Sequence, residues 1–144
     1  MAEQSTAPTG EQGLACAQPR LLIVEDELLI AWELRETAHD LGWMVCASVT
    51  TQEAAIEAAV HLRPDAILMD YRLGNGGDGL AAARRIREVA ETPIIFCTAY
   101  VHWLNPALLS VPSTQLVAKP VRPSSLREAL AWAIGIGRPA ATAG

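Results

Sequence analysis

Residues 64–70 read Pro64-Asp65-Ala66-Ile67-Leu68-Met69-Asp70, a short apolar run that follows a turn signal and ends on a carboxylate. An apolar run of this length, bounded by Pro and Asp, is typical of a strand that is buried on both faces. Such strands occur in parallel sheets that have helices on each side. We therefore predict a central strand over residues 66–69, with Asp70 as the first residue beyond it.

Short apolar runs and amphipathic stretches alternate along the rest of the chain. Strands are predicted at residues 20–24, 43–47, 66–69, 93–97 and 115–118. Helices are predicted at residues 27–41, 51–62 and 78–90, and from Ser124 or Ser125 onward, with Asp78 and Thr50 or Thr51 as caps. The Gly-rich residues 73–77 are expected to form a loop, and residues 101–109 a weak helix interrupted by Pro106. This alternation predicts an α/β fold built on a doubly wound parallel sheet.

The bulk composition suits one globular domain. The chain has 144 residues, of which 51% are hydrophobic and 19% charged, and its net charge is −5. A domain of this length buries a sizeable core without help from metals or disulfides. We assign the domain to residues 19–137, and we expect flexible tails at residues 1–18 and 138–144, which are poor in large apolar side chains.

Several functional classes are disfavoured by the same composition. Binding to nucleic acid needs clustered Lys and Arg, and the chain is acidic without a long basic run. No apolar run approaches the length of a membrane span, and no signal-peptide pattern opens the chain. Cys16, Cys46 and Cys97 show no metal-binding spacing, which fits a reducing compartment. We therefore expect a cytoplasmic protein that contacts neither nucleic acid nor membrane.

Polar residues follow the predicted strands at the point where each strand ends. Glu25 and Asp26 follow the first strand, Asp70 the third, Thr98 the fourth and Lys119 the fifth. Ligands of parallel sheets bind at the carboxyl ends of the strands, so these side chains should converge. Carboxylates that end adjacent strands repel one another, so the cluster needs either a cation or raised pKa values, and oxygen ligands favour Mg²⁺ as the cation. Asp70 is then a nucleophile that could form an acyl phosphate, while Lys119 and Thr98 face an incoming anion.

The strings around these residues resemble the signature motifs of response-regulator receiver domains. The similar strings are Leu22-Ile23-Val24-Glu25-Asp26-Glu27, residues 64–70 quoted above, Asp78-Gly79, Thr98-Ala99 and Lys119-Pro120. The resemblance covers about residues 20–136. It implies a flavodoxin-like (βα)5 fold with strand order 2-1-3-4-5.

The resemblance also implies the chemistry of the site. Asp70 would be phosphorylated by a histidine kinase or a phosphotransfer protein, and Mg²⁺ would be bound by Glu25, Asp26, Asp70 and the backbone carbonyl of Arg72. Thr98 and Lys119 would contact the phosphoryl group, and the Lys119–Pro120 peptide bond would be cis. By this reading the protein is a signalling switch, which catalyses only its own phosphorylation and dephosphorylation and acts through a downstream protein as a monomer or weak homodimer.

Three positions depart from the common pattern or tune it. Most receivers have an aromatic residue where this chain has Leu116, so the coupling to Thr98 should differ. Residues 93–100, Pro93-Ile94-Ile95-Phe96-Cys97-Thr98-Ala99-Tyr100, resemble variant receivers with a Phe-Ala-Thr-Gly-Tyr-like motif, which are often stand-alone and have an atypical fourth helix. No DNA-binding output domain is expected. Arg72 and Tyr100 occupy positions that modulate phosphoryl lifetime in the family.

Other interpretations were weighed against this one. A receiver-like module that binds partners without phosphorylation would keep the fold but not need the full acidic set. A small-molecule phosphatase would need a second acid where Arg72 stands. Residues 74–79 match a dinucleotide-binding Gly pattern, but no acidic residue ends the next strand.

Trp32 and Trp132 could form an exposed patch where a kinase docks, or each could cover the margin of the sheet.

Overall fold

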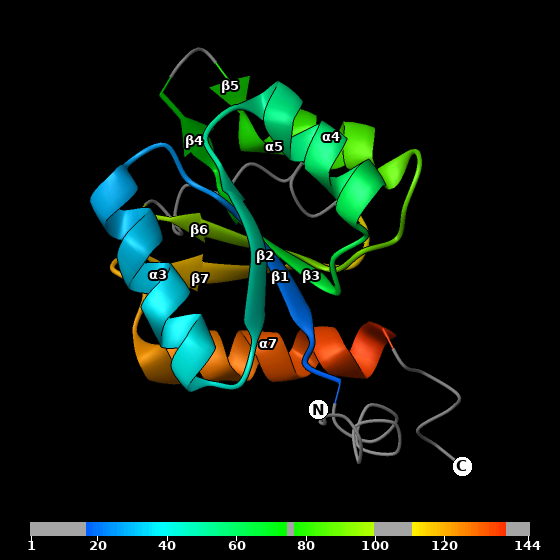
Figure 1. Ribbon diagram of the computed structural model, residues 1–144. Coiled ribbons are helices and arrows are strands. Elements are labelled where there is room, and N and C mark those ends of the chain that lie inside the picture. Colours follow the sequence, from blue (N-terminus) through cyan, green and yellow to red (C-terminus); the bar gives the residue numbers. More distant parts are fainter. Residues whose placement is uncertain (1–16, 75–76, 100–110, 138–144) are drawn as a thin grey trace, which may run out of the picture.

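The computed structural model describes residues 17–74, 77–99 and 111–137. Its elements in chain order are β1 (Arg20–Val24), α3 (Leu28–Asp40), β2 (Met44–Val49), α4 (Gln52–Leu62), β3 (Ala66–Asp70), β4 (Arg72–Leu73), β5 (Gly77–Asp78), α5 (Gly79–Arg87), β6 (Ile94–Thr98), β7 (Thr114–Ala118) and α7 (Pro123–Gly137). The main sheet has five parallel strands in the order β2-β1-β3-β6-β7, with α3 and α7 on one face and α4 and α5 on the other (Figure 1). The predicted doubly wound sheet and its strand order are therefore confirmed.

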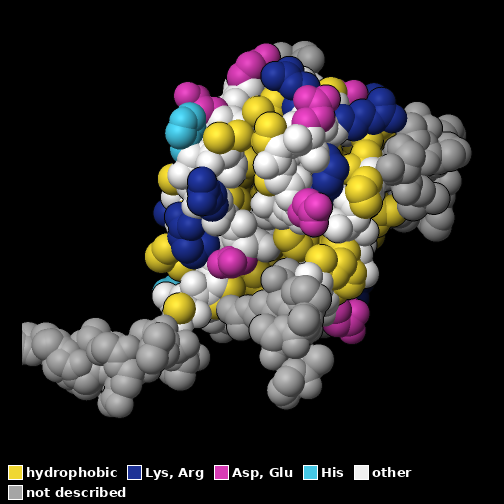
Figure 2. Space-filling view, turned by 90° about the vertical axis from the view of Figure 1, so that its right-hand side faces the viewer, with side chains coloured by type: hydrophobic (Ala, Val, Ile, Leu, Met, Phe, Trp, Pro, Cys, Tyr) yellow, Lys and Arg dark blue, Asp and Glu magenta, His cyan; other side chains and the backbone are white. Residues whose placement is uncertain are grey.

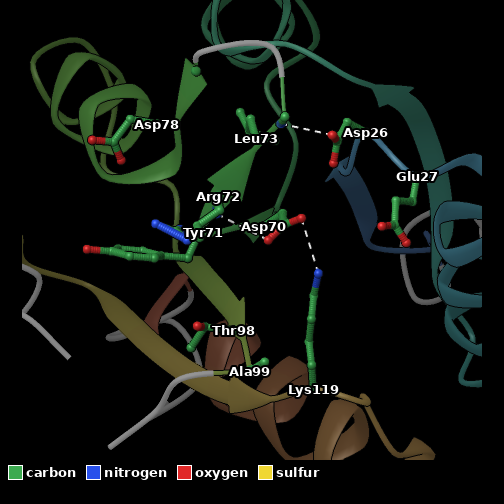
Figure 3. A pocket seen from close by; sticks show the side chains of 12 residues that line it. Asp26, Glu27, Asp70, Tyr71, Arg72, Leu73, Asp78, Thr98, Ala99 and Lys119 are labelled. Atoms are coloured by element: carbon green, nitrogen blue, oxygen red, sulfur yellow. Dashed lines mark hydrogen bonds and ion pairs between the residues drawn. The ribbon is translucent and has the colours of Figure 1, made fainter. Parts of the chain in front are cut away.

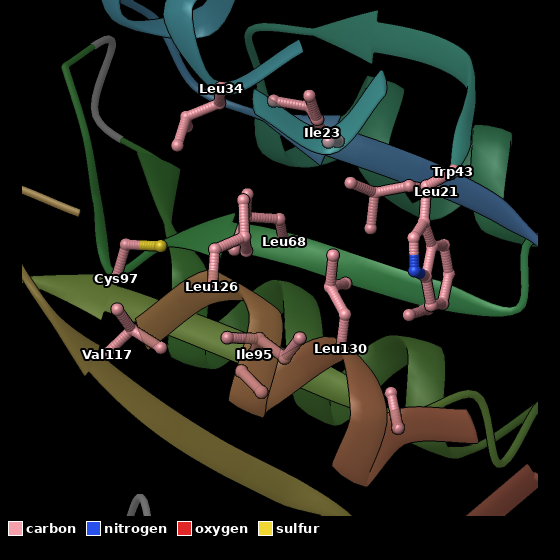
Figure 4. Packing of buried hydrophobic residues seen from close by; sticks show 14 of the residues in the cluster. Leu21, Ile23, Leu34, Trp43, Leu68, Ile95, Cys97, Val117, Leu126 and Leu130 are labelled. Carbon is pink, nitrogen blue, oxygen red and sulfur yellow. The ribbon is translucent and has the colours of Figure 1, made fainter. Parts of the chain in front are cut away.

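Two apolar clusters, one on each face of the sheet, form the core. On the first face, strand residues such as Ile23, Leu68 and Ile95 pack against Leu126 and Leu130 of α7 (Figure 4). On the second face, the alternating residues of the same strands pack against α4 and α5. The buried residues that the main sheet contributes to this cluster are Leu22, Val24, Ile67, Met69, Ile94 and Phe96. Successive strand side chains point to opposite faces, so a sheet covered on both sides requires the continuous apolar runs that the sequence shows.

The ends of the helices follow local sequence signals. The side chains of Thr51 and Asp78 accept hydrogen bonds from Ala54 N (3.1 Å) and Leu80 N (2.8 Å), which confirms both as caps. Two boundary predictions were wrong. Helix α5 ends at Arg87 and not at residue 90, and Val89 beyond its end is 64% exposed. Helix α7 begins at Pro123 and not after Ser124 or Ser125, because proline is favoured in the first helical turn.

The Gly-rich segment after β3 is more ordered than a loop. Strand β4 pairs antiparallel with β5, with Arg72 opposite Asp78 and Leu73 opposite Gly77. Leu73 is buried and joins the cluster beneath α4 and α5, so it anchors this small hairpin to the core. Residues 75–76, which lie between the two strands in sequence, are outside the described residues, as are residues 1–16 of the predicted tail 1–18, the predicted tail 138–144, and the segment 100–110 where the atypical fourth helix is predicted.

The surface of the described residues carries both signs of charge. Figure 2 shows the side of the molecule that lies to the right in Figure 1, where Lys and Arg side chains are interspersed with Asp and Glu. No continuous basic surface covers the described part of this side. Within the ranges that the structure describes, every helix is too short or too polar to cross a bilayer.

Candidate functional site

The carboxyl end of the sheet brings three carboxylates together. Glu25, Asp26 and Asp70 each offer an oxygen, and these oxygens all lie within 4.8 Å of one another. Asp70 is the last residue of β3, and the other two directly follow β1, its neighbour in the sheet. The expected convergence of the acids is therefore present. Glu25 and Asp70 are buried, whereas Asp26 is half-buried.

Lys119 supplies the positive charge that faces this cluster. Its Nζ lies 3.1 Å from Asp70 Oδ2 (Figure 3) and 3.3 Å from Glu25 Oε1. Lys119 directly follows β7, and its backbone N–H donates to Thr98 O at 2.9 Å, which extends the β6–β7 ladder by one bond. The Lys119–Pro120 peptide bond is cis, as predicted. The lysine is thus fixed beside Asp70 from both its backbone and its side chain.

Electrostatics show that the cluster is short of positive charge. Burial raises the pKa of Glu25 to about 7, and the charge of Asp70 adds to the effect, although the Glu27 N–H and Lys119 oppose it. Burial disfavours the charged form of Lys119, but Asp70 and Glu25 outweigh burial and raise the pKa of its ammonium group. Three carboxylates thus face one ammonium group among the described residues, which leaves a formal deficit of positive charge. A divalent cation would remove this deficit.

Backbone N–H groups of the hairpin segment bind one carboxylate oxygen of Asp70 and one of Asp26. Arg72 N donates to Asp70 Oδ1 at 3.2 Å, and Gly74 N donates to Asp26 Oδ2 at 2.8 Å. Asp70 is therefore held between a lysine on one oxygen and a backbone donor on the other. The part played by Gly74 was not predicted from the sequence, because a backbone donor leaves no signal in residue type.

A cavity of about 700 Å³ opens over Asp70. It is lined by Asp26, Glu27, Asp70, Tyr71, Arg72, Leu73, Gly74, Gly77, Asp78, Thr98, Ala99 and Lys119. Its walls place a hydroxyl, an ammonium group and several further carboxylates around the carboxylate of Asp70 (Figure 3). A site of this kind can hold a small anion and a hard cation together.

The comparison with known families decides the identity of the fold. The family model for the response regulator receiver domain matches residues 21–131. The chain belongs to this family. The receiver domain is 32% identical over 126 residues to the phyllosphere-induced regulator PhyR of Methylorubrum extorquens, covering 87% of this chain and 47% of PhyR. It is 33% identical over 95 residues to the transcriptional regulatory protein PdtaR of Mycobacterium tuberculosis, covering 66% of this chain and 45% of PdtaR. The chain thus spans about half the length of these relatives.

Solved structures agree with this assignment. The signal receiver domain of a modulated diguanylate cyclase from Desulfovibrio desulfuricans G20 superimposes with a TM-score of 0.75 and 32% identity, covering 84% of this chain and 97% of that one. The receiver domain of PhyR from Erythrobacter litoralis gives a TM-score of 0.69 and 31% identity, covering 81% of this chain and 90% of that one. The receiver fold predicted from the sequence is therefore confirmed.

The other residues singled out in the sequence are distributed around the receiver site. Arg72 lines the cavity, and its backbone contacts Asp70. Leu116 lies in β7 opposite Phe96 of β6 and packs, partly buried, against the second core cluster. Tyr100 is outside the described residues. Trp32 is 58% exposed, whereas Trp132 packs against the first core cluster.

Proposed function

We propose that this receiver domain is a phosphorylation switch whose acceptor is Asp70. A histidine kinase or a phosphotransfer protein donates the phosphoryl group, Mg²⁺ is required, and phosphorylation changes contacts with a downstream protein. The observation that carries the proposal is the position of Asp70, which lines the cavity and lies beside the Lys119 ammonium and two further carboxylates.

The residues of the site fit a magnesium ion. Mg²⁺ prefers oxygen ligands and retains waters that phosphate oxygens can replace. Glu25, Asp26 and Asp70 would hold it, together with the backbone carbonyl of Arg72. The three carboxylates are opposed by Lys119 alone among the described residues, so a divalent cation would balance their charge. When bound, the ion neutralises charge on the transferring phosphoryl group.

The chain's own residues perform the remaining steps. An oxygen of Asp70 attacks phosphorus, so that the N–P bond of the donor phosphohistidine breaks as the O–P bond of the acyl phosphate forms. Lys119 keeps a positive charge beside the acceptor, and the Thr98 hydroxyl, at the cavity wall, donates to a phosphoryl oxygen. Attack by water later releases inorganic phosphate and restores the carboxylate. The domain catalyses these two reactions on itself and acts on no other substrate.

Beryllofluoride binding separates this proposal from a receiver-like module that works without phosphorylation. Beryllofluoride with Mg²⁺ mimics a phosphoryl group on a carboxylate. We expect it to bind the wild-type protein and the control Asp40→Asn, an exposed change at the end of α3. Asp70→Asn should fold but lose binding, measured by fluorine NMR. No binding to wild type, or equal binding to Asp70→Asn, would support the phosphorylation-independent module instead.

The residues beside the acceptor are proposed to set the lifetime of the phosphoryl group. Arg72 is exposed at the cavity wall, where its side chain can restrict the approach of water to Asp70. Arg72→Ala should change the dephosphorylation rate more than it changes stability, and Tyr100→Ala should do the same. Leu116 replaces the aromatic residue of most receivers, so the movement of Thr98 is coupled differently to β7.

The exposed side of α3 is proposed as the surface that meets the phosphodonor protein. Trp32 is 58% exposed, and Leu28 and Leu29 at the start of the same helix are 75% and 70% exposed. Trp32 also lines a groove with Lys119 and Pro120, next to the acceptor site. Trp132 contributes less, because it packs against the core. Trp32→Ala should slow transfer from a protein donor and leave beryllofluoride binding unchanged; equal transfer rates would exclude this surface.

The setting of the switch is also proposed. We place the receiver domain in the cytoplasm as a monomer or weak homodimer, with a downstream protein rather than DNA as the target of the phosphorylated form. The net charge of −5 supports the exclusion of nucleic acid.

A further inference from the structure

We infer that Gly74 is a positioning residue for Asp26, and that the β4–β5 hairpin sets the magnesium affinity of the site through it. The inference rests on the proposed function, because it concerns a proposed Mg²⁺ ligand. Gly74 lies directly after β4 and contributes no side chain. Its effect therefore comes from its backbone N–H and from the space that the absent side chain leaves.

The backbone of Gly74 orients the Asp26 carboxylate. Gly74 N donates to Asp26 Oδ2 at 2.8 Å, which Figure 3 shows as a bond from the hairpin to the end of β1. Asp26 is half-buried. Lys119 forms ion pairs with Glu25 and Asp70 but not with Asp26. One carboxylate oxygen is engaged by the N–H, which leaves the other for a cation. Outer partners that orient a metal ligand in this way raise metal affinity.

The space beside Gly74 is occupied by the same carboxylate. A Cβ built on Gly74 would overlap Asp26 Oδ2 at a separation that real Cβ atoms essentially never show. Its remaining neighbour within 4 Å is Asp26 Cγ, at 3.5 Å. The atoms that must move are thus the end of a side chain, which can rotate away without disturbing the backbone. A side chain at position 74 would therefore turn Asp26 out of the site while the domain stays folded.

The hairpin is fixed to the domain independently of any metal. Leu73 is 4% exposed within the second core cluster, and Asp78 N donates to Gln52 Oε1 of α4 at 3.2 Å. Gly74 directly follows the buried Leu73, so its backbone is anchored on that side. Its bond to Asp26 is made by the protein alone and needs no ion.

Magnesium titration of Gly74→Ala tests the inference. We expect the Mg²⁺ dissociation constant, measured by calorimetry on the full chain, to rise about 10- to 100-fold. The metal-free melting temperature should stay close to that of wild type. Gly135→Ala is the matched control, because nothing lies within 4 Å of a Cβ at that α7 position. Its Mg²⁺ affinity should equal that of wild type.

Two further variants keep the test decisive. Gln52→Ala removes the acceptor of the Asp78 N–H and leaves Asp26 untouched. It should weaken Mg²⁺ binding about threefold, because it loosens the second strand of the hairpin. This variant tests the inference independently if Gly74→Ala fails to fold. In an Asp26→Ala background, Gly74→Ala should cause no further loss, because the effect passes through Asp26.

The outcomes distinguish this inference from the proposed function. If wild type binds Mg²⁺ and Gly74→Ala binds it equally well, the inference is overturned and the proposed function stands. A full additional loss in the Asp26→Ala background would also overturn it. If wild type binds no Mg²⁺, the proposed function fails and the inference fails with it.

Discussion

The two sides of the carboxylate site around Asp70 are held in different ways. On the buried side, Glu25, Asp70 and Lys119 follow or end strands of the main sheet and are joined by ion pairs of 3.1 and 3.3 Å. On the hairpin side, Asp26 is held by one backbone N–H from Gly74. The buried side is thus part of the core, whereas the hairpin side is attached to it. Changes on the buried side should cost stability, and changes on the hairpin side should alter binding with little loss of stability.

Removal of Lys119 gives the largest effect that this comparison predicts. Lys119→Met should lower the metal-free free energy of unfolding by about 3 kcal/mol at pH 8, because it leaves two buried carboxylates without their cation. Urea denaturation measures the loss. Arg127→Met also removes one positive charge, at an exposed position of α7. Its free energy of unfolding should lie within about 0.5 kcal/mol of the wild-type value. A Lys119→Met protein as stable as wild type would remove the distinction between the two sides.

The pH dependence of stability sharpens the comparison. The pKa of Glu25 is raised from 4.5 to about 7 in the folded state. As the pH rises, Glu25 therefore loses its proton in the unfolded chain before it does so in the folded domain. Metal-free stability should therefore fall by about 2 kcal/mol between pH 5 and pH 7. Glu25→Gln should remove most of this fall, whereas the exposed change Glu33→Gln should not. An unchanged slope in Glu25→Gln would show that another group on the buried side titrates.

A change at the base of the hairpin should have the smallest effect. Asp78→Ala removes the cap that accepts from Leu80 N at 2.8 Å, which should lower stability by about 1 kcal/mol. Thr51→Ala, which removes the cap of α4, provides a comparison of the same size. Thermal denaturation measures both. A loss for Asp78→Ala as large as that for Lys119→Met would show that the hairpin stabilises the domain as much as the buried side does.

The buried side was predictable from the sequence, and the physical reason is the sheet. Glu25, Asp70 and Lys119 each stand at or just beyond the end of an apolar run, and parallel strands bring such ends to one edge. The lengths of the runs located the strands within one or two residues. The same logic placed Thr98 in the cavity wall, where the structure has it.

The hairpin side was less predictable, because short elements and backbone contacts leave weak patterns. Strands β4 and β5 have two residues each, too few to show alternation, and the segment was interpreted as a loop. Leu73 was the one apolar residue that could have indicated an anchored turn. The bond from Gly74 to Asp26 depends on the path of the backbone, which residue types do not encode.

Strand β3 is paired on both sides along its length, and all five of its residues are buried. Its amide hydrogens should exchange with solvent only when the whole domain opens. A covalent group added to Asp70 would consequently be attached to the central strand of the sheet. A shift of that strand would disturb its pairing with both neighbours, so the displacement would be taken up by the segments that line the cavity. The extent to which these segments can shift, and not a deformation of the sheet, would then limit how much a chemical change at Asp70 alters the rest of the domain.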